Sequence, residues 1–342
     1  MAEPIARACV LPDLPYPTIT AVDVSVLRIR ADAGINRRWV MHALNSALVR
    51  GQAEREASGT TRKRITRKKL GRVMVPMPPI GEQDQIVGTL SEIGRQLDHA
   101  EEALTRASNG MRALSRAFYR DLGFGLQDLP EGWQRKQLSE IAECKLGKML
   151  DAQKNEGTAR PYLRNMSVQW GHFDLGDVKE MRIKDSEAER FEVRRGDLMM
   201  CEGGEPGRCA IWDRDEVMFF QKALHRIRPT EAVSATYLQR YFAFAAQAGA
   251  LERHLTGTTI KHLPGNKLAA IDIPVPPLAE QREIVRRASD LDEQLAPVAE
   301  GVAVAGRQRG HLLRAALNAA ALGRLRAGIP PNSASENSAA VA

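Results

Sequence analysis

A proline-rich segment occurs twice in this chain, and a long helix-prone segment follows each copy. The two copies are Val75–Val87 and Ile271–Val285. Proline fixes φ and lacks a backbone donor, so helix is excluded up to the end of each proline run. Glu280 then stands in the first turn of the following segment, where the positive end of a helix dipole favours an acidic side chain. Each copy therefore predicts a hinge at which irregular or β structure gives way to a helix.

The likeness between the copies extends well beyond the prolines. A shift of 198 positions overlays the chain on itself without a gap over about sixty residues. The matching groups are Arg28-Ile29-Arg30 with Arg226-Ile227-Arg228, Gly59-Thr60-Thr61 with Gly257-Thr258-Thr259, and Glu82-Gln83 with Glu280-Gln281. A single offset over this length indicates a duplicated unit, a β-rich domain followed by a helix, rather than two unrelated linkers.

Both helix-prone segments carry apolar residues three or four positions apart, which is the pattern of a heptad seam. The first seam runs from Ile86 to Phe118 and includes Leu97, and the second runs from Ile284 to Ala316 and includes Leu295. We expect the two seams to pair as an antiparallel rod. About 35 residues at a rise of 1.5 Å give a spacer of roughly 50 Å. Pro297 should kink or interrupt the second helix.

Four motifs together resemble the specificity subunit of type I restriction–modification enzymes, over nearly the whole chain. They are Leu129-Pro130-Glu131-Gly132-Trp133, Arg195-Gly196-Asp197-Leu198, the Gly257-Thr258-Thr259 loop and the doubled Pro-Pro-x-x-Glu-Gln hinge, which is the most specific. The resemblance implies an α+β fold with two β-rich target-recognition domains, separated by long conserved helices that pair as an antiparallel coiled coil. It also implies three partners: double-stranded DNA, methyltransferase (modification) subunits and a restriction/translocase subunit.

The resemblance and the repeat together predict the domain organisation. We expect a partial first target-recognition domain at 1–79, a first spacer helix at 80–122, a complete second target-recognition domain at 129–277, a second spacer helix at 278–326 and a disordered tail at 327–342. Leu129 stands 97 residues before Arg226, whereas 27 residues precede Arg28. We therefore expect the first domain to lack about its N-terminal half, and the chain to read one half-site through residues 129–277.

Within the partial first domain, Thr18–Arg30 alternates apolar and polar residues and predicts a strand, and Arg37–Ala57 predicts a helix. The complete domain shows short strands separated by glycine-rich turns, which favours a mainly antiparallel or mixed sheet. One such strand is expected at Val217–Ile227.

Charge and cysteine content limit the function classes. The net charge of +7 and the pI near 9.4 favour an acidic partner, with nucleic acid ahead of membrane, although a merely basic protein fits the charge equally well. The four cysteines lack metal-ligand spacing, which predicts reduced thiols in a cytoplasmic protein without a metal or other cofactor. The chain holds no apolar run of eighteen residues and no signal-peptide core.

The most basic stretch is Ser58–Arg72, where seven Lys or Arg residues fall between Arg62 and Arg72 with no acid among them. Such density suits phosphate contacts, although a solvated basic loop is the commoner case for an isolated charge run. The candidate contacts here are Thr60, Thr61, Arg62, Lys63, Arg67 and Lys68. The second copy of the loop has fewer cations, and its candidates are Thr258, Thr259, Lys261 and His262.

Further candidate DNA contacts lie in the complete domain. They are Arg164 and Asn165 at a strand, Arg208 in a glycine-rich turn, and Lys222 before the strand that carries Arg226. Arginine and asparagine are the residue types that pair bidentately with guanine and adenine. For Arg164 and Asn165 the solvent face of a strand is at least as good an interpretation, and for Arg208 a tight turn is the better one. The repeated Arg226 and Arg228 fit a scaffold or phosphate role better than base choice.

A catalytic site is not apparent in the sequence. The Asn/Asp-Pro-Pro-aromatic motif of amino-methyltransferases is missing, and Asp197 with Glu202 or Glu205 offers only a weak metal site without the lysine of a nuclease. We therefore expect a non-catalytic specificity subunit whose partners carry the chemistry. The alternatives are a truncated, non-functional remnant or an assembly protein without competent DNA reading, and, much weaker, a self-sufficient nuclease.

Overall fold

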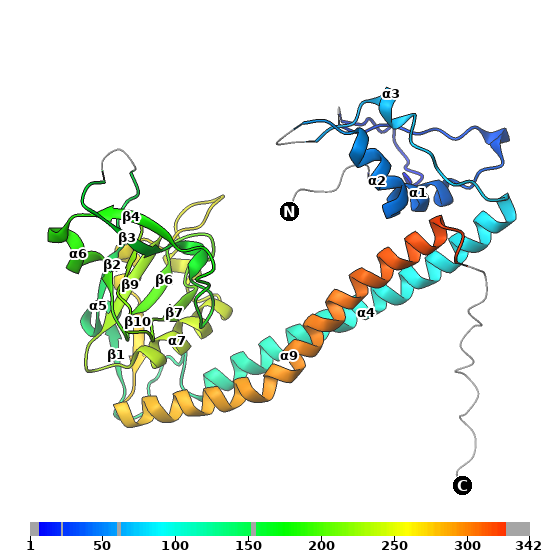
Figure 1. Ribbon diagram of the computed structural model, residues 1–342. Coiled ribbons are helices and arrows are strands. Elements are labelled where there is room, and N and C mark those ends of the chain that lie inside the picture. Colours follow the sequence, from blue (N-terminus) through cyan, green and yellow to red (C-terminus); the bar gives the residue numbers. More distant parts are fainter. Residues whose placement is uncertain (1–6, 22, 60–62, 152–154, 326–342) are drawn as a thin grey trace, which may run out of the picture. The chain divides into compact units, whose positions relative to one another are not determined.

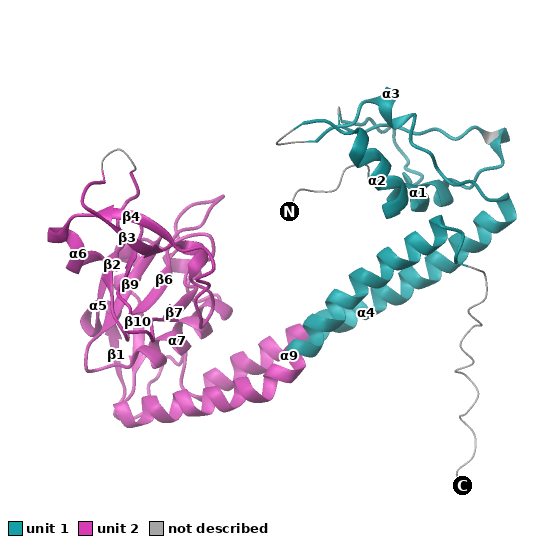
Figure 2. Cartoon of the chain, in the orientation of Figure 1, with its two compact units in different colours: residues 1–107, 300–342 teal, residues 108–299 magenta. Residues whose placement is uncertain are grey.

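The computed structural model describes residues 7–21, 23–59, 63–151 and 155–325. The chain divides into two compact units, with residues 1–107 and 300–342 in unit 1 and residues 108–299 in unit 2 (Figure 2). Both long helices contribute to both units, and each unit is described by itself. Within the described ranges, no helix combines the length and the apolar character needed to cross a bilayer.

The centre of unit 2 is an antiparallel four-stranded sheet (Figure 1). Its strand order is β2 (Ala142–Leu146), β9 (Leu224–Pro229), β6 (Leu198–Cys201) and β7 (Cys209–Ile211). Successive side chains of a strand point to opposite faces. Leu198 and Met200 therefore join a core with α7 (Ala235–Gln247), whereas Met199 and Cys201 join a second core on the other face. The sheet is buried on both sides.

A second four-stranded sheet contributes to that second core. Its order is β4 (Lys179–Ile183), β3 (Thr158–Leu163), β8 (Met218–Phe220) and β5 (Glu192–Val193), and α6 (Asp185–Phe191) precedes β5. Strands β3 and β8 are parallel and the other pairs antiparallel, so the expected mixed sheet is confirmed. The single strand expected at Val217–Ile227 is instead two strands, because a turn at residues 221–223 separates β8 from β9. Ala223 there has a φ of 85°.

The hinge of unit 2 is fixed on the strand that opens the domain. Strand β1 (Gln134–Gln137) pairs antiparallel with β10 (Asp272–Val275), and α5 (Leu138–Ile141) follows β1. The indole N–H of Trp133 donates to Oε2 of Glu280 at 2.6 Å. Gly123, with a φ of 93°, makes room for this ring, since a Cβ there would lie 2.6 Å from it. The Leu129–Trp133 motif and the Pro-Pro-x-x-Glu-Gln hinge are therefore in direct contact.

Unit 1 contains α1 (Arg37–Asn45), α2 (Ala47–Glu56) and α3 (Arg67–Leu70). The helix expected over Arg37–Ala57 is divided at Ser46, because the Ser46 hydroxyl accepts the Val49 N–H at 3.3 Å and so starts a new helix.

The strand expected at Thr18–Arg30 is wrong. The described residues of this segment form no strand, and Ile19 is 95% exposed. Its counterpart β9 is held between β2 and β6, and the described part of unit 1 offers no strand beside these residues. An alternating pattern forms a strand only where a partner backbone is present.

The hinge glutamines make the same bonds in both units. In unit 1, Gln83 donates to the Pro78 carbonyl at 2.7 Å and accepts the Asn36 N–H at 2.8 Å. In unit 2, Gln281 donates to the Pro276 carbonyl at 2.9 Å and accepts the Ser234 N–H at 2.9 Å. Every position differs from its counterpart by 198, and Asn36 and Ser234 are the N-caps of α1 and α7.

A second pair of bonds obeys the same offset. The Trp39 indole N–H donates to the Pro76 carbonyl at 3.0 Å, and the Tyr237 hydroxyl donates to the Pro274 carbonyl at 2.6 Å. The duplication predicted from the sequence is therefore confirmed in the contacts that attach each hinge to its helix.

The long helices are α4 (Ile80–Asp121) and α9 (Leu278–Ala321), and they run antiparallel within each unit. In unit 2, Arg287 lies 3.5 Å from Asp121, and in unit 1, Arg309 lies 2.7 Å from Glu101. The antiparallel pairing of the two long helices, which was expected as part of the α+β fold, is thereby confirmed. Helix α9 is continuous through Pro297, so of the expected kink or interruption the interruption does not occur.

Candidate nucleic-acid interface

Four connections of unit 2 meet along one side, which we call the loop edge. It comprises the end of β3 at residues 164–165, the β6–β7 turn at 202–208, the β8–β9 turn at 221–223 and the loop 256–262. The β6–β7 turn links the others through hydrogen bonds. The Asn165 amide donates to the Gly203 carbonyl at 2.9 Å, the Leu263 N–H donates to the Glu202 carbonyl at 2.7 Å, and the Glu202 N–H donates to the Ala223 carbonyl at 2.9 Å.

The structure brings three candidate base contacts together at this edge. Arg208 donates to the Asn165 carbonyl at 3.1 Å and to Glu205 at 3.1 Å. Arg164 donates to the Asp177 carboxylate at 2.7 Å. Hydrogen bonds from Lys179 and Arg164 lower the pKa of Asp177. Both arginines are thus held in place and neutralised by an acid.

The Gly-Thr-Thr loop of unit 2 is closed at its base by Thr256 and His262, which exchange backbone hydrogen bonds of 2.8 and 2.9 Å. Gly257 has a φ of 91°, and a Cβ there would lie 2.2 Å from the Ile260 carbonyl oxygen, so the turn requires glycine. Thr258 and Thr259 are exposed. Lys261 is paired with Glu252.

A hollow of about 600 Å³ lies between this loop and the β6–β7 turn. Trp170, which the sequence analysis missed, lines it and donates its indole N–H to Glu205 at 2.7 Å. The signal for Trp170 was an aromatic residue before a glycine in the connection between β3 and β4. Thr258, Thr259 and Lys261 line the same hollow.

Lys222 stands exposed in the β8–β9 turn, where its N–H donates to the Lys148 carbonyl at 2.7 Å. Lys148 itself is paired with Glu187 at 2.8 Å. No salt bridge links Lys222 to another described residue of unit 2, so it differs from Arg164, Arg208 and Lys261.

The basic segment of unit 1 repeats the closed loop. Ser58 and Arg64 exchange backbone hydrogen bonds of 2.9 and 2.8 Å, at the positions equivalent to Thr256 and His262. Lys63, Arg67 and Lys68 are exposed, and no salt bridge joins them to another described residue. The candidates Thr60, Thr61 and Arg62 lie outside the described residues.

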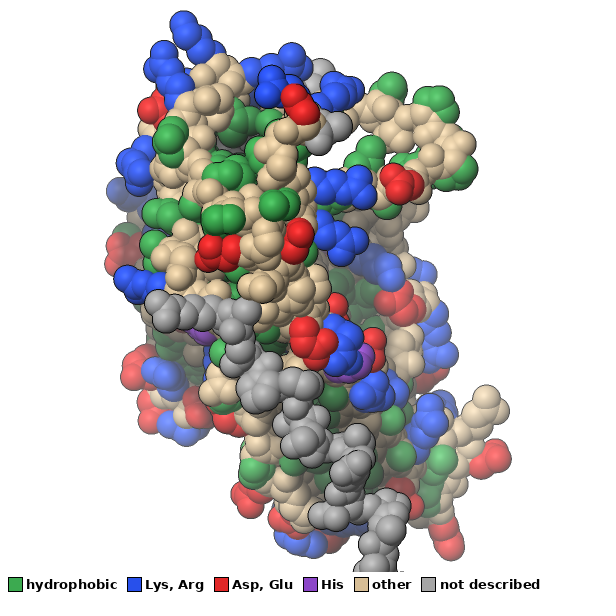
Figure 3. Space-filling model, turned by 90° about the vertical axis from the view of Figure 1, so that its right-hand side faces the viewer, with side chains coloured by type: hydrophobic (Ala, Val, Ile, Leu, Met, Phe, Trp, Pro, Cys, Tyr) green, Lys and Arg blue, Asp and Glu red, His purple; other side chains and the backbone are tan. Residues whose placement is uncertain are grey.

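Figure 3 shows the surface of unit 1, where Lys and Arg side chains gather along the top of the view. In Figure 1 this side of unit 1 carries α3. Unit 1 therefore presents free cations, whereas most cations of the loop edge in unit 2 are paired with acids.

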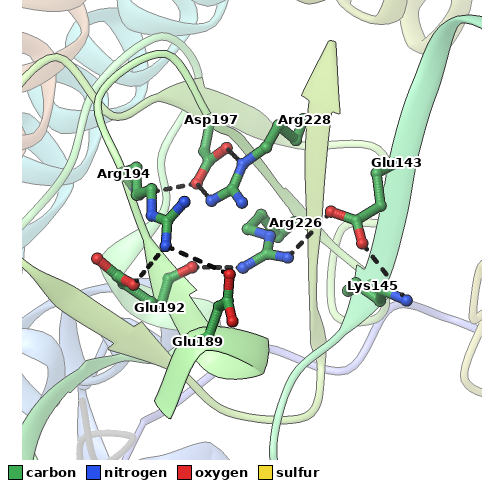
Figure 4. A network of polar contacts seen from close by, with 8 residues as sticks. All are labelled: Glu143, Lys145, Glu189, Glu192, Arg194, Asp197, Arg226 and Arg228. Carbon is green, nitrogen blue, oxygen red and sulfur yellow. Dashed lines mark hydrogen bonds and ion pairs between the residues drawn. The ribbon is translucent and has the colours of Figure 1, made fainter. Parts of the chain in front are cut away.

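The repeated Arg226 and Arg228 belong to a buried ionic network away from the loop edge (Figure 4). Asp197, only 1% exposed, accepts from Arg228 at 2.7 and 2.8 Å and from the Arg194 N–H at 2.7 Å. Arg226 donates to the Glu192 carbonyl at 2.5 Å. Burial lowers the pKa of Arg226, whereas the hydrogen bond to Asp197 raises the pKa of Arg228.

This network corrects the weak metal site considered for Asp197 with Glu202 or Glu205. The oxygens of Asp197 are already occupied by Arg228 and Arg194. Throughout the described ranges, no group of three or more His, Cys, Asp or Glu side chains could hold a metal ion. The two arginines support the sheet, as the scaffold interpretation expects.

Comparison with known proteins identifies the family. Residues 130–298 match the type I restriction modification DNA specificity domain. The EcoKI specificity subunit of Escherichia coli strain K12 is 25% identical over 281 residues, which cover 77% of this chain and 60% of that protein. The EcoBI specificity subunit of Escherichia coli is 24% identical over 286 residues, covering 75% of this chain and 59% of that protein.

A solved structure, from work on complex assembly and conformational transition of the type I R-M system, matches with a TM-score of 0.64 at 20% identity. It covers 84% of this chain and 71% of that chain, and it confirms the fold class. Residues 130–298 of this chain therefore belong to the family of type I restriction modification DNA specificity domains. The chain spans about 60% of the length of the two curated relatives.

Proposed function

We propose that this chain is a sequence-specific DNA-binding subunit of a type I restriction–modification complex. The observation that carries the proposal is the loop edge, which lies within the residues that match the DNA specificity domain. Hydrogen bonds hold its polar side chains in place, so the edge presents a preformed surface. A rigid polar surface suits base readout, because each base pair displays a distinct set of donors and acceptors in the major groove.

The two units are suited to different contacts. Phosphate contacts need free cations, which the basic segment of unit 1 supplies through Lys63, Arg67 and Lys68. The loop edge carries paired cations, which suits directional hydrogen bonds better than bulk charge attraction. The proposed DNA contacts of unit 2 are Arg164, Asn165, Arg208, Lys222, Thr258, Thr259, Lys261 and His262.

The proposal includes the partners and the division of labour. Methyltransferase subunits and a restriction/translocase subunit would carry the chemistry, and this chain would be non-catalytic. We take residues 129–277 as the domain that reads one half-site, and the two long helices as the spacer. A cytoplasmic location fits a DNA target and the unpaired cysteines. The competing function is an assembly protein without competent DNA reading.

Selection from a random pool of duplex DNA tests the proposal. The chain, with and without its methyltransferase subunits, is used to retain DNA, and the retained pool is sequenced. We expect one enriched sequence block. Recovery of the starting pool without enrichment in either condition would favour the assembly protein.

Neutralising Lys63, Arg67 and Lys68 together to glutamine should weaken binding to all DNA sequences alike. Each lost phosphate contact should flatten the slope of log K against log salt by up to about 0.9. Binding is measured by fluorescence anisotropy over a salt series. The matched control is Arg95, Arg106 and Arg112 to glutamine, on exposed positions of α4. A slope equal to the parent's in the first variant would show that the basic segment does not contact phosphate.

A further inference from the structure

One edge of unit 1 is open where the matching edge of unit 2 is covered. Residues 73–77 correspond to residues 271–275 at the offset of 198. In unit 2, β10 pairs with β1 from Gln134↔Val275 to Gln137↔Asp272, and the Leu138 N–H donates to the Ile271 carbonyl at 2.9 Å. The described residues of unit 1 include no strand that takes the place of β1.

On the side of this edge that faces the helix, the backbone groups have hydrogen-bond partners in both units. In unit 1, the Gln52 side chain binds the N–H and the carbonyl of Met74 at 3.0 and 2.9 Å, and Trp39 binds the Pro76 carbonyl. In unit 2, the hydroxyls of Tyr241 and Tyr237 bind the carbonyls of Asp272 and Pro274. Residues 74 and 76 are therefore equivalent to residues 272 and 274, since their carbonyls are bound from the same side.

On the other side of the edge, the backbone groups have hydrogen-bond partners only in unit 2. Alternate residues of an extended segment direct their backbone groups to opposite sides. Because Pro274 lacks an N–H and its carbonyl is bound by Tyr237, the groups that face β1 belong to Ile273 and Val275. Their counterparts are Val75 and Met77, and no backbone hydrogen bond links either of them to another described residue.

Exposure follows the same division. Val275 is 7% exposed beneath β1, whereas its counterpart Met77 is 47% exposed. Glu280 accepts the Trp133 indole N–H in unit 2, whereas no described tryptophan of unit 1 donates to its counterpart Glu82. An unpaired edge with exposed apolar side chains is a template for strand addition.

We propose that residues 73–77 form an acceptor edge that binds an extended segment of another polypeptide with the pattern of β1. That pattern is a tryptophan followed by residues whose alternate backbone groups face the edge, as in residues 133–138 of this chain. Unit 2 provides the precedent, because the same edge binds such a segment there within one chain. The proposal does not rest on DNA binding, and its test contains no DNA.

The probe is a fluorescein-labelled peptide with the sequence of residues 130–141, added to the full chain and followed by fluorescence anisotropy. We expect saturable binding with a dissociation constant on the order of 10–100 µM, the range of a short segment with few hydrogen bonds. The covalently attached β1 of unit 2 should keep the peptide out of that unit, because its effective concentration is far higher.

The register supplies matched peptides. Lys136 lies opposite Ile273, the counterpart of Val75, so Lys136→Pro should weaken binding at least tenfold by removing a facing donor. Arg135 lies opposite Pro274 and faces away, so Arg135→Pro should retain binding. In the protein, Val75→Pro should weaken binding at least tenfold, and Met74→Ala should not.

Three outcomes would overturn the proposal. They are the absence of saturable binding up to about 1 mM, equal binding of the two proline peptides, and a dimer of this chain that excludes the peptide from the edge.

Discussion

Replacing Asp197 with asparagine is expected to lower the free energy of unfolding of unit 2 by about 3–5 kcal/mol. Both oxygens of Asp197 accept hydrogen bonds from Arg228, and Oδ2 also accepts the Arg194 N–H. Asparagine has nearly the same size but no charge, so Arg228 would lose its paired counter-charge, whereas Arg226 keeps its ion pair with Glu143. Denaturant unfolding followed by circular dichroism measures the change.

The matched control is Asp215→Asn. Asp215 binds Arg195 with the same two-bond geometry, at 2.8 and 2.9 Å, but its side chain is 87% exposed. Exposed ion pairs contribute little to stability, so this variant should unfold like the parent. If both variants unfold like the parent, the network of Figure 4 does not support the fold.

Replacing the hinge glutamine Gln281 with leucine should destabilise unit 2 by about 3 kcal/mol or more, from three orphaned backbone groups at roughly 1–3 kcal/mol each. Gln281 is fully buried and binds the Ser234 N–H at 2.9 Å, the Ala232 carbonyl at 3.0 Å and the Pro276 carbonyl at 2.9 Å. Leucine fills the space but satisfies none of these groups.

Gln83→Leu tests the equivalent site of unit 1, where two backbone groups would be orphaned. Gln294→Leu, at an exposed position of α9, is the control and should change the thermal midpoint little. A shift of the midpoint by Gln281→Leu no larger than that of the control would contradict the structural role of the hinge glutamine.

The duplicated hinge was predictable from the sequence because its contacts are short-ranged and depend on residue identity. Gln83 and Gln281 carry the same side chain at the same distance from the prolines, and they form the same bonds. The Gly257-Thr258-Thr259 segment was recognised as a loop because it recurs at the offset of 198, and the structure shows that its turn requires Gly257. The heptad seams predicted the long helices because a spacing of three or four residues is also a short-range pattern.

Other features depend on partners that a local pattern does not reveal. Thr18–Arg30 has the alternation of a strand but no neighbouring strand in the described residues. Arg164 and Arg208 were candidate base contacts, but their ion pairs were not foreseen: Asp177 binds Arg164 from the connection that follows β3, and Glu205 binds Arg208 within the β6–β7 turn. Trp170 lines the hollow only because the β6–β7 turn and the loop 256–262 come together in three dimensions.

The hinge bonds also have a consequence for the order of folding. Each glutamine holds the N–H of an N-cap residue that lies 47 residues earlier in the chain, in both units. The start of α7 and the docking of its hinge are therefore one long-range event, and the start of α1 is coupled in the same way. The entropy cost of closing a loop of this length is met before the hydrogen bonds of the hinge form, so we expect both docking steps to occur late in folding. Side-chain truncations at Gln83 and Gln281 should therefore accelerate unfolding more than they slow refolding.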